Sequence, residues 1–161
     1  MKHESAIKPD GPVAMQLLGD IVSFSAVAAG GETVSVADSI AAVRKLFGDG
    51  KVTEQKLEQA IAGTEDVIMP LLRSLPQRAV LEVSGAELAE VLRLLSVQAG
   101  VAVPTASVEH LFNLLADHAC GSPVAWRQPV PAAHVALGLT VLREVLHHGG
   151  FDAVSLSSPA L

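Results

Sequence analysis

The chain has 161 residues and a formal net charge of −6; half of its residues are apolar and only 17% are charged. This length fits one domain, and the apolar content excludes an intrinsically disordered chain. Acidic residues outnumber basic ones by 17 to 11, and only 3% of residues are aromatic. The composition therefore lacks the basic clusters and stacking rings that nucleic acids and anionic membranes require, and we expect neither as a partner.

A lone cysteine and the absence of long apolar runs indicate where the protein works. Cys120 has no second cysteine for an internal disulfide, which is typical of a reducing compartment. The longest uncharged apolar stretch, from Val130 to Leu142, is shorter than the roughly 20 residues that span a bilayer. We expect a cytoplasmic protein with a polar tail over residues 1–10 and a single α/β domain over residues 11–161.

The first part of that domain is predicted to be a three-stranded antiparallel meander. Apolar runs or alternating patterns cover residues 13–18, 21–27 and 32–36. Gly19-Asp20 and Gly30-Gly31 separate these runs, and such dipeptides supply the positive φ angles that tight hairpin turns need.

Helices and short buried strands alternate in the rest of the chain. Apolar residues at helical spacing predict two helices after the meander, the first capped by Asp38 or Ser39 and the second by Thr53. Gly63 and Pro70 are expected to break or kink the second helix. The remaining predicted elements are a strand at 79–83, a helix at 87–98 ended by Gly100, a strand at 101–103, a helix capped by Ser107, a loop at 121–131, a helix from Pro131 to about 148 and a strand at 153–156. The fold class is thus α/β: a mixed sheet that opens with the meander and has helices packed against it.

One turn and two arginines are candidates for anion binding. Ser84 and Gly85 join a predicted strand to a helix, where free amides and the helix dipole can hold phosphate. Glu87 in the first helical turn competes for that positive end, so plain helix capping is the favoured interpretation. Arg44 and Arg127 are the candidate anion donors, because a guanidinium binds two phosphate oxygens at once. The alternative for both arginines is a solvated surface charge.

The last predicted helix carries a candidate metal motif. Glu144 and His147 stand at i and i+3, a pair used in di-metal carboxylate bundles, and His110 or His118 could add a ligand. The motif has no second copy, and histidines in a last helical turn commonly bind free carbonyls instead. We therefore assign no metal and no cofactor.

No residue set predicts catalysis. Cys120 follows a predicted helix, where the dipole raises the pKa of a thiol, and nucleophilic cysteines need the opposite end. Nearby carboxylates such as Glu87 and Glu90 are pairs on a helix surface, which are usually solvated. The residues themselves therefore favour a protein that is not an enzyme.

Several stretches resemble the C-terminal half of the exopolyphosphatase/guanosine pentaphosphate phosphohydrolase family, which has the actin-like ATPase superfold. Residues 15–20 with the following hairpin resemble that family's strand pair, and residues 41–46 (AAVRKL) resemble its Gly-Ala-Val-Arg-Leu helix start. Residues 79–88 (AVLEVSGAEL) take the place of its strand, Gly-Gly-Thr turn and helix. The tail, residues 132–158, resembles its last helix and strand. The resemblance covers most of the chain and implies a half-domain of the actin-like type.

The same comparison implies that hydrolysis is lost. The family's Asp-Ile-Gly-Gly-Gly-Ser phosphate loop is absent, and its Gly-Gly-Thr turn is replaced by Ser84, Gly85 and Ala86. No segment corresponds to the lobe that forms the other wall of the family's cleft. No catalytic residue of the family can be placed on this sequence, so we expect a reduced, non-hydrolytic relative or a piece of a longer chain.

Three hypotheses follow. The leading one is a small non-enzymatic α/β domain that acts through contact with a protein partner, as a homo-oligomer, because the high aliphatic content favours a surface that a partner covers. The second is a phosphate- or nucleotide-binding phosphohydrolase-like domain that uses Ser84, Gly85, Arg44 and Arg127. The third is a helix-borne metal-binding protein.

Overall fold

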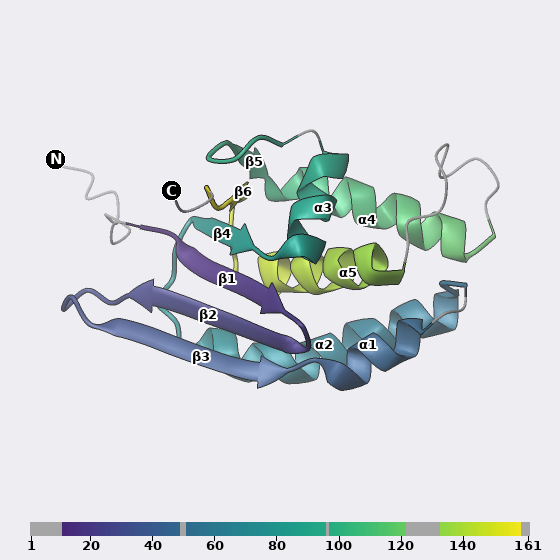
Figure 1. Cartoon of the computed structure of the whole chain (residues 1–161), viewed down its shortest axis with the longest axis horizontal. Helices are drawn as coiled ribbons and strands as arrows, with labels where there is room; N and C mark the ends of the chain where they lie inside the picture. Colours follow the sequence, from purple (N-terminus) through teal and green to yellow (C-terminus); the bar gives the residue numbers. More distant parts are fainter. Residues whose placement is uncertain (1–10, 49–50, 96, 122–132, 159–161) are drawn as a thin grey trace, which may run out of the picture.

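The computed structural model describes residues 11–48, 51–95, 97–121 and 133–158. These residues form a six-stranded mixed sheet with strand order β3-β2-β1-β4-β6-β5 (Figure 1). The predicted order of elements along the chain is confirmed. The strands are β1 (Val13–Leu18), β2 (Ile21–Val27), β3 (Thr33–Ser39), β4 (Val80–Ser84), β5 (Ala102–Pro104) and β6 (Ala153–Leu156). The helices are α1 (Ala41–Phe47), α2 (Glu54–Arg73), α3 (Ala86–Leu94), α4 (Thr105–Ala119) and α5 (Ala133–His148).

The predicted meander is confirmed in both turns. Strand β2 pairs antiparallel with β1 and with β3. Gly19 and Gly31 have φ angles of +58° and +86° in the two turns, and residues other than glycine rarely adopt such positive φ angles. Strands β4 and β6 extend the sheet in parallel to β1, and β5 closes it antiparallel to β6. The sheet is therefore mixed, as predicted.

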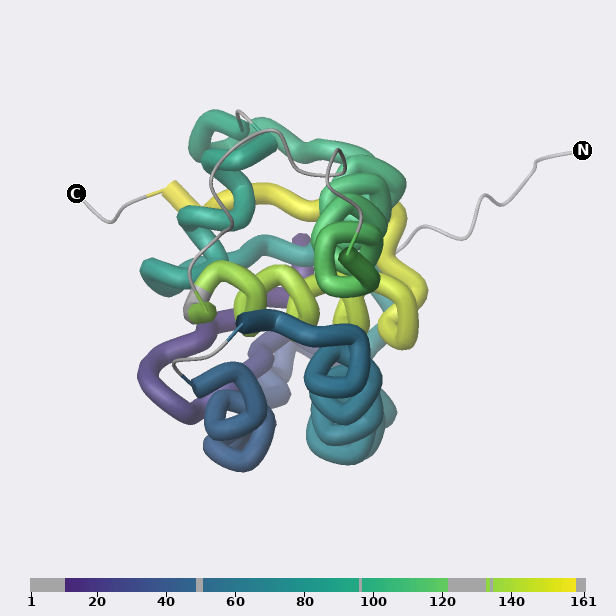
Figure 2. Tube along the Cα trace, turned by 90° about the vertical axis from the view of Figure 1, so that its right-hand side faces the viewer, coloured from purple at the N-terminus to yellow at the C-terminus, as the bar shows by residue number. Residues whose placement is uncertain are grey.

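Helix α5 lies at the centre of the helical layer. It packs against α1, α2, α3 and α4, and Figure 2 shows it surrounded by the other helices. From Val135 to Leu146 nearly all of its residues are buried. These residues join the strand side chains beneath them in one apolar cluster. Among the described residues, no helix is long and apolar enough to cross a membrane.

The two faces of the β1–β2–β3 part of the sheet differ. Residues that are opposite one another on paired strands share a face. Met15 and its partner Phe24 belong to the buried face, which packs into the helical layer. Ala14 and its partner Ser25 belong to the second face, and both are half-buried. This second face, here named the open face, carries mainly small or polar side chains: Ala14, Gln16, Ser23, Ser25, Ser35 and Ala37.

Helix boundaries differ from the predictions at three places. Helix α2 continues through Pro70, although proline lacks the N–H that bonds the carbonyl four residues earlier. Leu71 and Leu72 pack against the core beyond it and hold the last turn in place. Helix α3 ends at Leu94 instead of 98, where the amide of Val97 donates to the carbonyl of Leu92. Helix α4 starts at Thr105, before the predicted Ser107 cap.

Capping near α1 and α2 follows the sequence more closely. The Thr53 hydroxyl accepts a hydrogen bond from the amide of Lys56 at 3.2 Å, which confirms the predicted cap of α2. At α1 the Ser39 hydroxyl accepts from the amide of Ala41 at 3.2 Å, although the cap position itself is Ile40. The expected tail at 1–10 and the predicted loop at 121–131, apart from Gly121, lie outside the described residues.

Candidate functional site

The candidate anion-binding residues converge where β1 and β4 end. Because these two strands are parallel and adjacent, their carboxyl ends lie side by side at the same end of the sheet. The Ser84-Gly85 turn leaves β4 there, and the Gly19-Asp20 turn leaves β1 beside it. Helix α1 brings Arg44 to the same place, 2.6 Å from the carbonyl oxygen of Gly19. Arg44, Ser84 and Gly85 thus lie at the same end of the two strands, and Arg127 lies outside the described residues.

Packing dictates the conformation of Gly85. Its φ angle is +111°, and a Cβ atom at this position would stand 2.3 Å from the carbonyl oxygen of Leu17. Only glycine combines that backbone conformation with such a close approach of two chain segments. Gly85 also precedes the first turn of α3 and supplies no side-chain cap. The turn is shaped by its contact with β1, which explains the glycine without any ligand.

Arg44 is held by groups of the protein itself. Its Nε donates to the Asp20 carboxylate at 2.7 Å. Its two terminal nitrogens donate to both carboxylate oxygens of Glu87, at 3.1 and 2.8 Å, in the two-pronged geometry that arginine adopts with phosphate. The Glu87 and Asp20 carboxylates hold the pKa of Arg44 above its usual value. One cation therefore faces two carboxylates, and the local charge is negative.

The pairing of Arg44 with Glu87 and Asp20 opposes anion binding at this turn. The Glu87 side chain is only 15% exposed and that of Arg44 is 33% exposed, so their pair is partly shielded from water. An incoming phosphate would have to displace Glu87 from the guanidinium. Ser84 lies on the other side of the turn, opposite Gln16 on the open face. Its side chain borders a shallow depression that β1, β2 and β3 also line.

A second cluster of ionisable groups joins α2 to the end of α5. Glu65, Glu144 and His148 each place one ligand atom within 4.8 Å of the others. The His148 Nε2 lies 3.4 Å from a Glu65 oxygen and 3.5 Å from a Glu144 oxygen. The sequence predicted Glu144 with His147, at i+3, and the structure brings His148, at i+4, to this carboxylate instead.

The histidines predicted on α4 take no part in this cluster. His110 and His118 are outside the group of three, and among the described residues no other such group is found. His147 lies near Glu109 instead. The sequence did not indicate Glu65, because nothing local links it to Glu144 and His148, which are 79 and 83 positions away.

Arg143 connects this cluster to α4. It donates to Glu109 at 2.8 and 3.2 Å and to Glu144 at 2.6 Å. Its bonds lower the pKa of Glu109 below the usual range. Glu144, only 1% exposed, has a raised pKa because burial disfavours its charged form, and the neighbouring Glu65 acts in the same direction. Protons and cations are therefore both favoured partners of this carboxylate.

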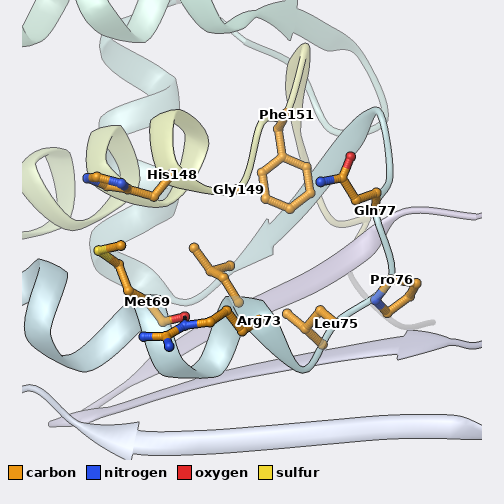
Figure 3. A pocket seen from close by; sticks show the side chains of 9 residues that line it. Met69, Arg73, Leu75, Pro76, Gln77, His148, Gly149 and Phe151 are labelled. Carbon is orange, nitrogen blue, oxygen red and sulfur yellow. Dashed lines mark hydrogen bonds between the residues drawn. The ribbon is translucent and has the colours of Figure 1, made fainter.

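The cleft beside His148 has a volume of about 350 Å³. Figure 3 shows His148 on one side of it, Met69 and Arg73 from α2 below, and Phe151 on the far side. Its wall mixes aliphatic, aromatic and basic groups. No local sequence pattern marks this cleft, because its two walls come from the ends of α2 and α5.

Cys120 stands at the end of α4, is exposed and is not part of either cluster. The pKa of its thiol is raised by desolvation and by nearby carboxylates, Glu54 first among them. The pKa is raised as predicted, but the causes are desolvation and these carboxylates, where the sequence had indicated the helix dipole. A raised thiol pKa means little thiolate at neutral pH and low nucleophilicity.

Comparison with known proteins gives matches at the level of structure only. No protein-family model matches the chain, and no curated protein matches it in sequence. Among solved structures, a PPX-GPPA enzyme of Aquifex aeolicus superposes with a TM-score of 0.66 at 13% identity, covering 95% of this chain and 55% of that one. An exopolyphosphatase-like protein gives 0.72 at 12%, covering 94% and 57%. An exopolyphosphatase from Cytophaga hutchinsonii gives 0.65 at 14%, covering 94% and 55%.

These matches confirm the fold that the resemblance implied. The chain shares the mixed α/β fold of part of these exopolyphosphatase and PPX-GPPA structures, and it spans about half of their length. At sequence identities of 12 to 14%, these matches establish a shared fold and nothing about activity.

Proposed function

We propose that this chain is a non-enzymatic α/β domain that acts through protein–protein contact, and that its partner is a second copy of itself. The observation that carries the proposal is the half-covered β1–β2–β3 sheet. One face of these strands is buried by helices, while the side chains of the other face are exposed or half-buried and β3 is an edge strand of the described sheet. The unpaired backbone groups of such an edge strand favour association.

Exposed aliphatic side chains on this part of the sheet support the proposal. Leu18 and Ile21 are direct cross-strand partners, and they are 68% and 47% exposed. Val27, at the other end of β2, is also exposed. A single exposed leucine is ordinary on a protein surface, whereas two large aliphatic side chains opposite each other form a small apolar patch.

The internal pairing of Arg44 favours this role over the phosphate-binding alternative. In a binding domain the guanidinium would be available to the ligand, and here Glu87 takes both of its terminal nitrogens. Phosphate or nucleotide binding at Ser84 and Gly85 is expected only once that carboxylate is removed.

The experiment that tests the proposal is sedimentation velocity of the full chain, from low micromolar to near-millimolar concentration, with native mass spectrometry of the protein as purified. We expect a concentration-dependent dimer of bare chains. A monomer at every concentration would refute self-association, and a monomer with stoichiometric extra mass would favour the ligand-binding alternative.

Metal binding is a second candidate function, favoured by the cluster of Glu65, Glu144 and His148. Two carboxylates and one imidazole are ligands that Zn²⁺ accepts, and three protein ligands leave a fourth position open. Zinc titration followed by calorimetry tests it. Replacement His148→Ala should abolish binding, while His147→Ala, a neighbour outside the cluster, should leave it unchanged. Equal binding by both variants would refute this site.

A further inference from the structure

The two edges of the sheet are protected differently. At one edge, β5 has only three residues and ends in Pro104, which has no N–H to offer a further strand. At the other edge, β3 runs for seven residues without proline or lysine, and Figure 1 shows it as the outermost strand. Natural sheets protect the edges that they do not use, with short strands, prolines and charges. Strand β3 carries one charged side chain, Asp38, and is the longer and less protected edge, so it is the edge expected to meet a partner.

The hydrogen bonds at the two ends of the β2–β3 pair reveal which backbone groups of β3 point outward. The amide of Ala28 donates to the carbonyl of Glu32 at 2.6 Å, and that of Ile40 donates to the carbonyl of Asp20 at 2.7 Å. Hydrogen-bonded pairs recur at every second residue of an antiparallel ladder. Val34, Val36 and Asp38 therefore bond toward β2, and the backbone groups of Thr33, Ser35, Ala37 and Ser39 point away from the sheet.

One of these outward groups is already satisfied. The amide of Ser39 donates to the Asp38 carboxylate at 2.7 Å. The amides of Thr33, Ser35 and Ala37 and the outward carbonyls have no neighbouring strand in the part of the chain that the structure describes.

Resting on the proposed self-association, we infer that two copies of this chain join through antiparallel pairing of their β3 strands about a two-fold axis at Val36. In this register Ser35 of one copy pairs with Ala37 of the other, and Thr33 pairs with Ser39. All four outward residues are used, and Thr33 donates to the Ser39 carbonyl that remains available. The sheets of the two copies become one continuous sheet.

Charge selects this register over its neighbours. With the axis at Val36, Asp38 lies opposite Val34 of the second copy, so the acidic side chains stay apart. An axis at Ser35 would place Asp38 directly opposite Glu32 of the other copy, and like charges in direct opposition destabilise a sheet. An axis at Ala37 would bring Thr33 against the start of α1. Only the register with its axis at Val36 pairs the whole strand without opposing Asp38 to Glu32 or Thr33 to the start of α1.

Packing supports the same axis. Val36 is half-buried on the helix side of the sheet and would meet its own copy as a non-hydrogen-bonded pair, the closer of the two antiparallel spacings. Such β-branched pairs on adjacent strands are favourable contacts.

The test compares edge variants by sedimentation velocity of the full chain. Ser35→Pro removes an amide that points away from β2, so the internal ladder is preserved and only the edge loses a donor. Ala37→Lys places a charge at the edge without touching the backbone, and it keeps the test valid where the proline variant fails to fold. Ser35→Ala is the matched control. We expect both edge variants to weaken dimerisation about tenfold or more and the control to dimerise like the parent.

Amide hydrogen exchange of the parent chain provides an independent measurement. At dimer-forming concentrations the Ser35 and Ala37 amides should exchange slowly, and on dilution they should become fast while the Val36 amide stays protected.

The outcomes separate this interface from the function on which it rests. A parent dimer that both edge variants leave intact overturns the β3 interface and retains self-association. In that case loss of the dimer in the double variant Leu18→Ser, Ile21→Ser would locate the contact on the open face. A parent chain that remains monomeric throughout overturns both the interface and the proposed self-association.

Discussion

Replacing Gly85 by alanine should destabilise the fold strongly, and the structure separates the two causes. The first is backbone strain: at φ +111° a residue with a Cβ costs about 1–3 kcal/mol. The second is the clash of that Cβ with the Leu17 carbonyl oxygen, 2.3 Å away, where backbone must move. Overpacking of this kind costs a further 1–3 kcal/mol or so. Together they give about 2–6 kcal/mol, a large share of the roughly 5–15 kcal/mol that stabilises a domain.

A matched control isolates the clash. Gly31, with φ +86°, has no atom within 4 Å of the position that a Cβ would take, so Gly31→Ala suffers strain alone. Urea unfolding followed by circular dichroism gives the free energy of unfolding of each variant. We expect Gly85→Ala to lose about 1–3 kcal/mol more than Gly31→Ala. Equal losses in the two variants, or a loss below about 1 kcal/mol for Gly85→Ala, would refute the close approach of the turn to β1.

Four further predictions concern the ion pairs and one cap. Arg143→Met should cost about 3 kcal/mol because it leaves the buried Glu144 without its arginine, while the exposed Arg93→Met should change urea stability by less than about 0.5 kcal/mol. The raised pKa of Glu144 means that the folded state binds the proton of this carboxyl more tightly than the unfolded state does. The free energy of unfolding should therefore fall as the pH rises from the unfolded-state pKa, near 4.5, through the folded-state pKa. Glu144→Gln should remove this dependence from the pH profile of unfolding. Glu87→Gln should give phosphate-dependent thermal stabilisation that the parent chain lacks, and an unresponsive variant would count against any anion site there. Thr53→Ala should cost about 1 kcal/mol by removing the cap of α2, and a neutral result in urea unfolding would show that the cap contributes nothing.

Local patterns account for what the sequence predicted well. The meander follows from glycine turns between alternating strands, and Thr53 caps α2 because its hydroxyl and the amide of Lys56 are three residues apart. Strand β6 was placed at its observed residues, because a short apolar run after two glycines is distinctive.

Long-range contacts account for what it did not predict. Arg44 and Glu87 are 43 positions apart, and no local sequence pattern predicts that their side chains form an ion pair. On α5 both His147 and His148 are within reach of Glu144 by helical spacing. Which of the two histidines joins the cluster depends on α2, because α2 places Glu65 on the side of α5 that carries His148. A sequence pattern names the ionisable residues, and packing between distant elements decides which of them meet.

The order of strands in the sheet has a consequence for biosynthesis. Strand β6 is the last of the described strands to leave the ribosome, yet it occupies an interior place between β4 and β5. Until it arrives, one side of β4 and the whole of β5 stay without a strand partner, and a premature stop before Ala153 would split the sheet instead of trimming its edge.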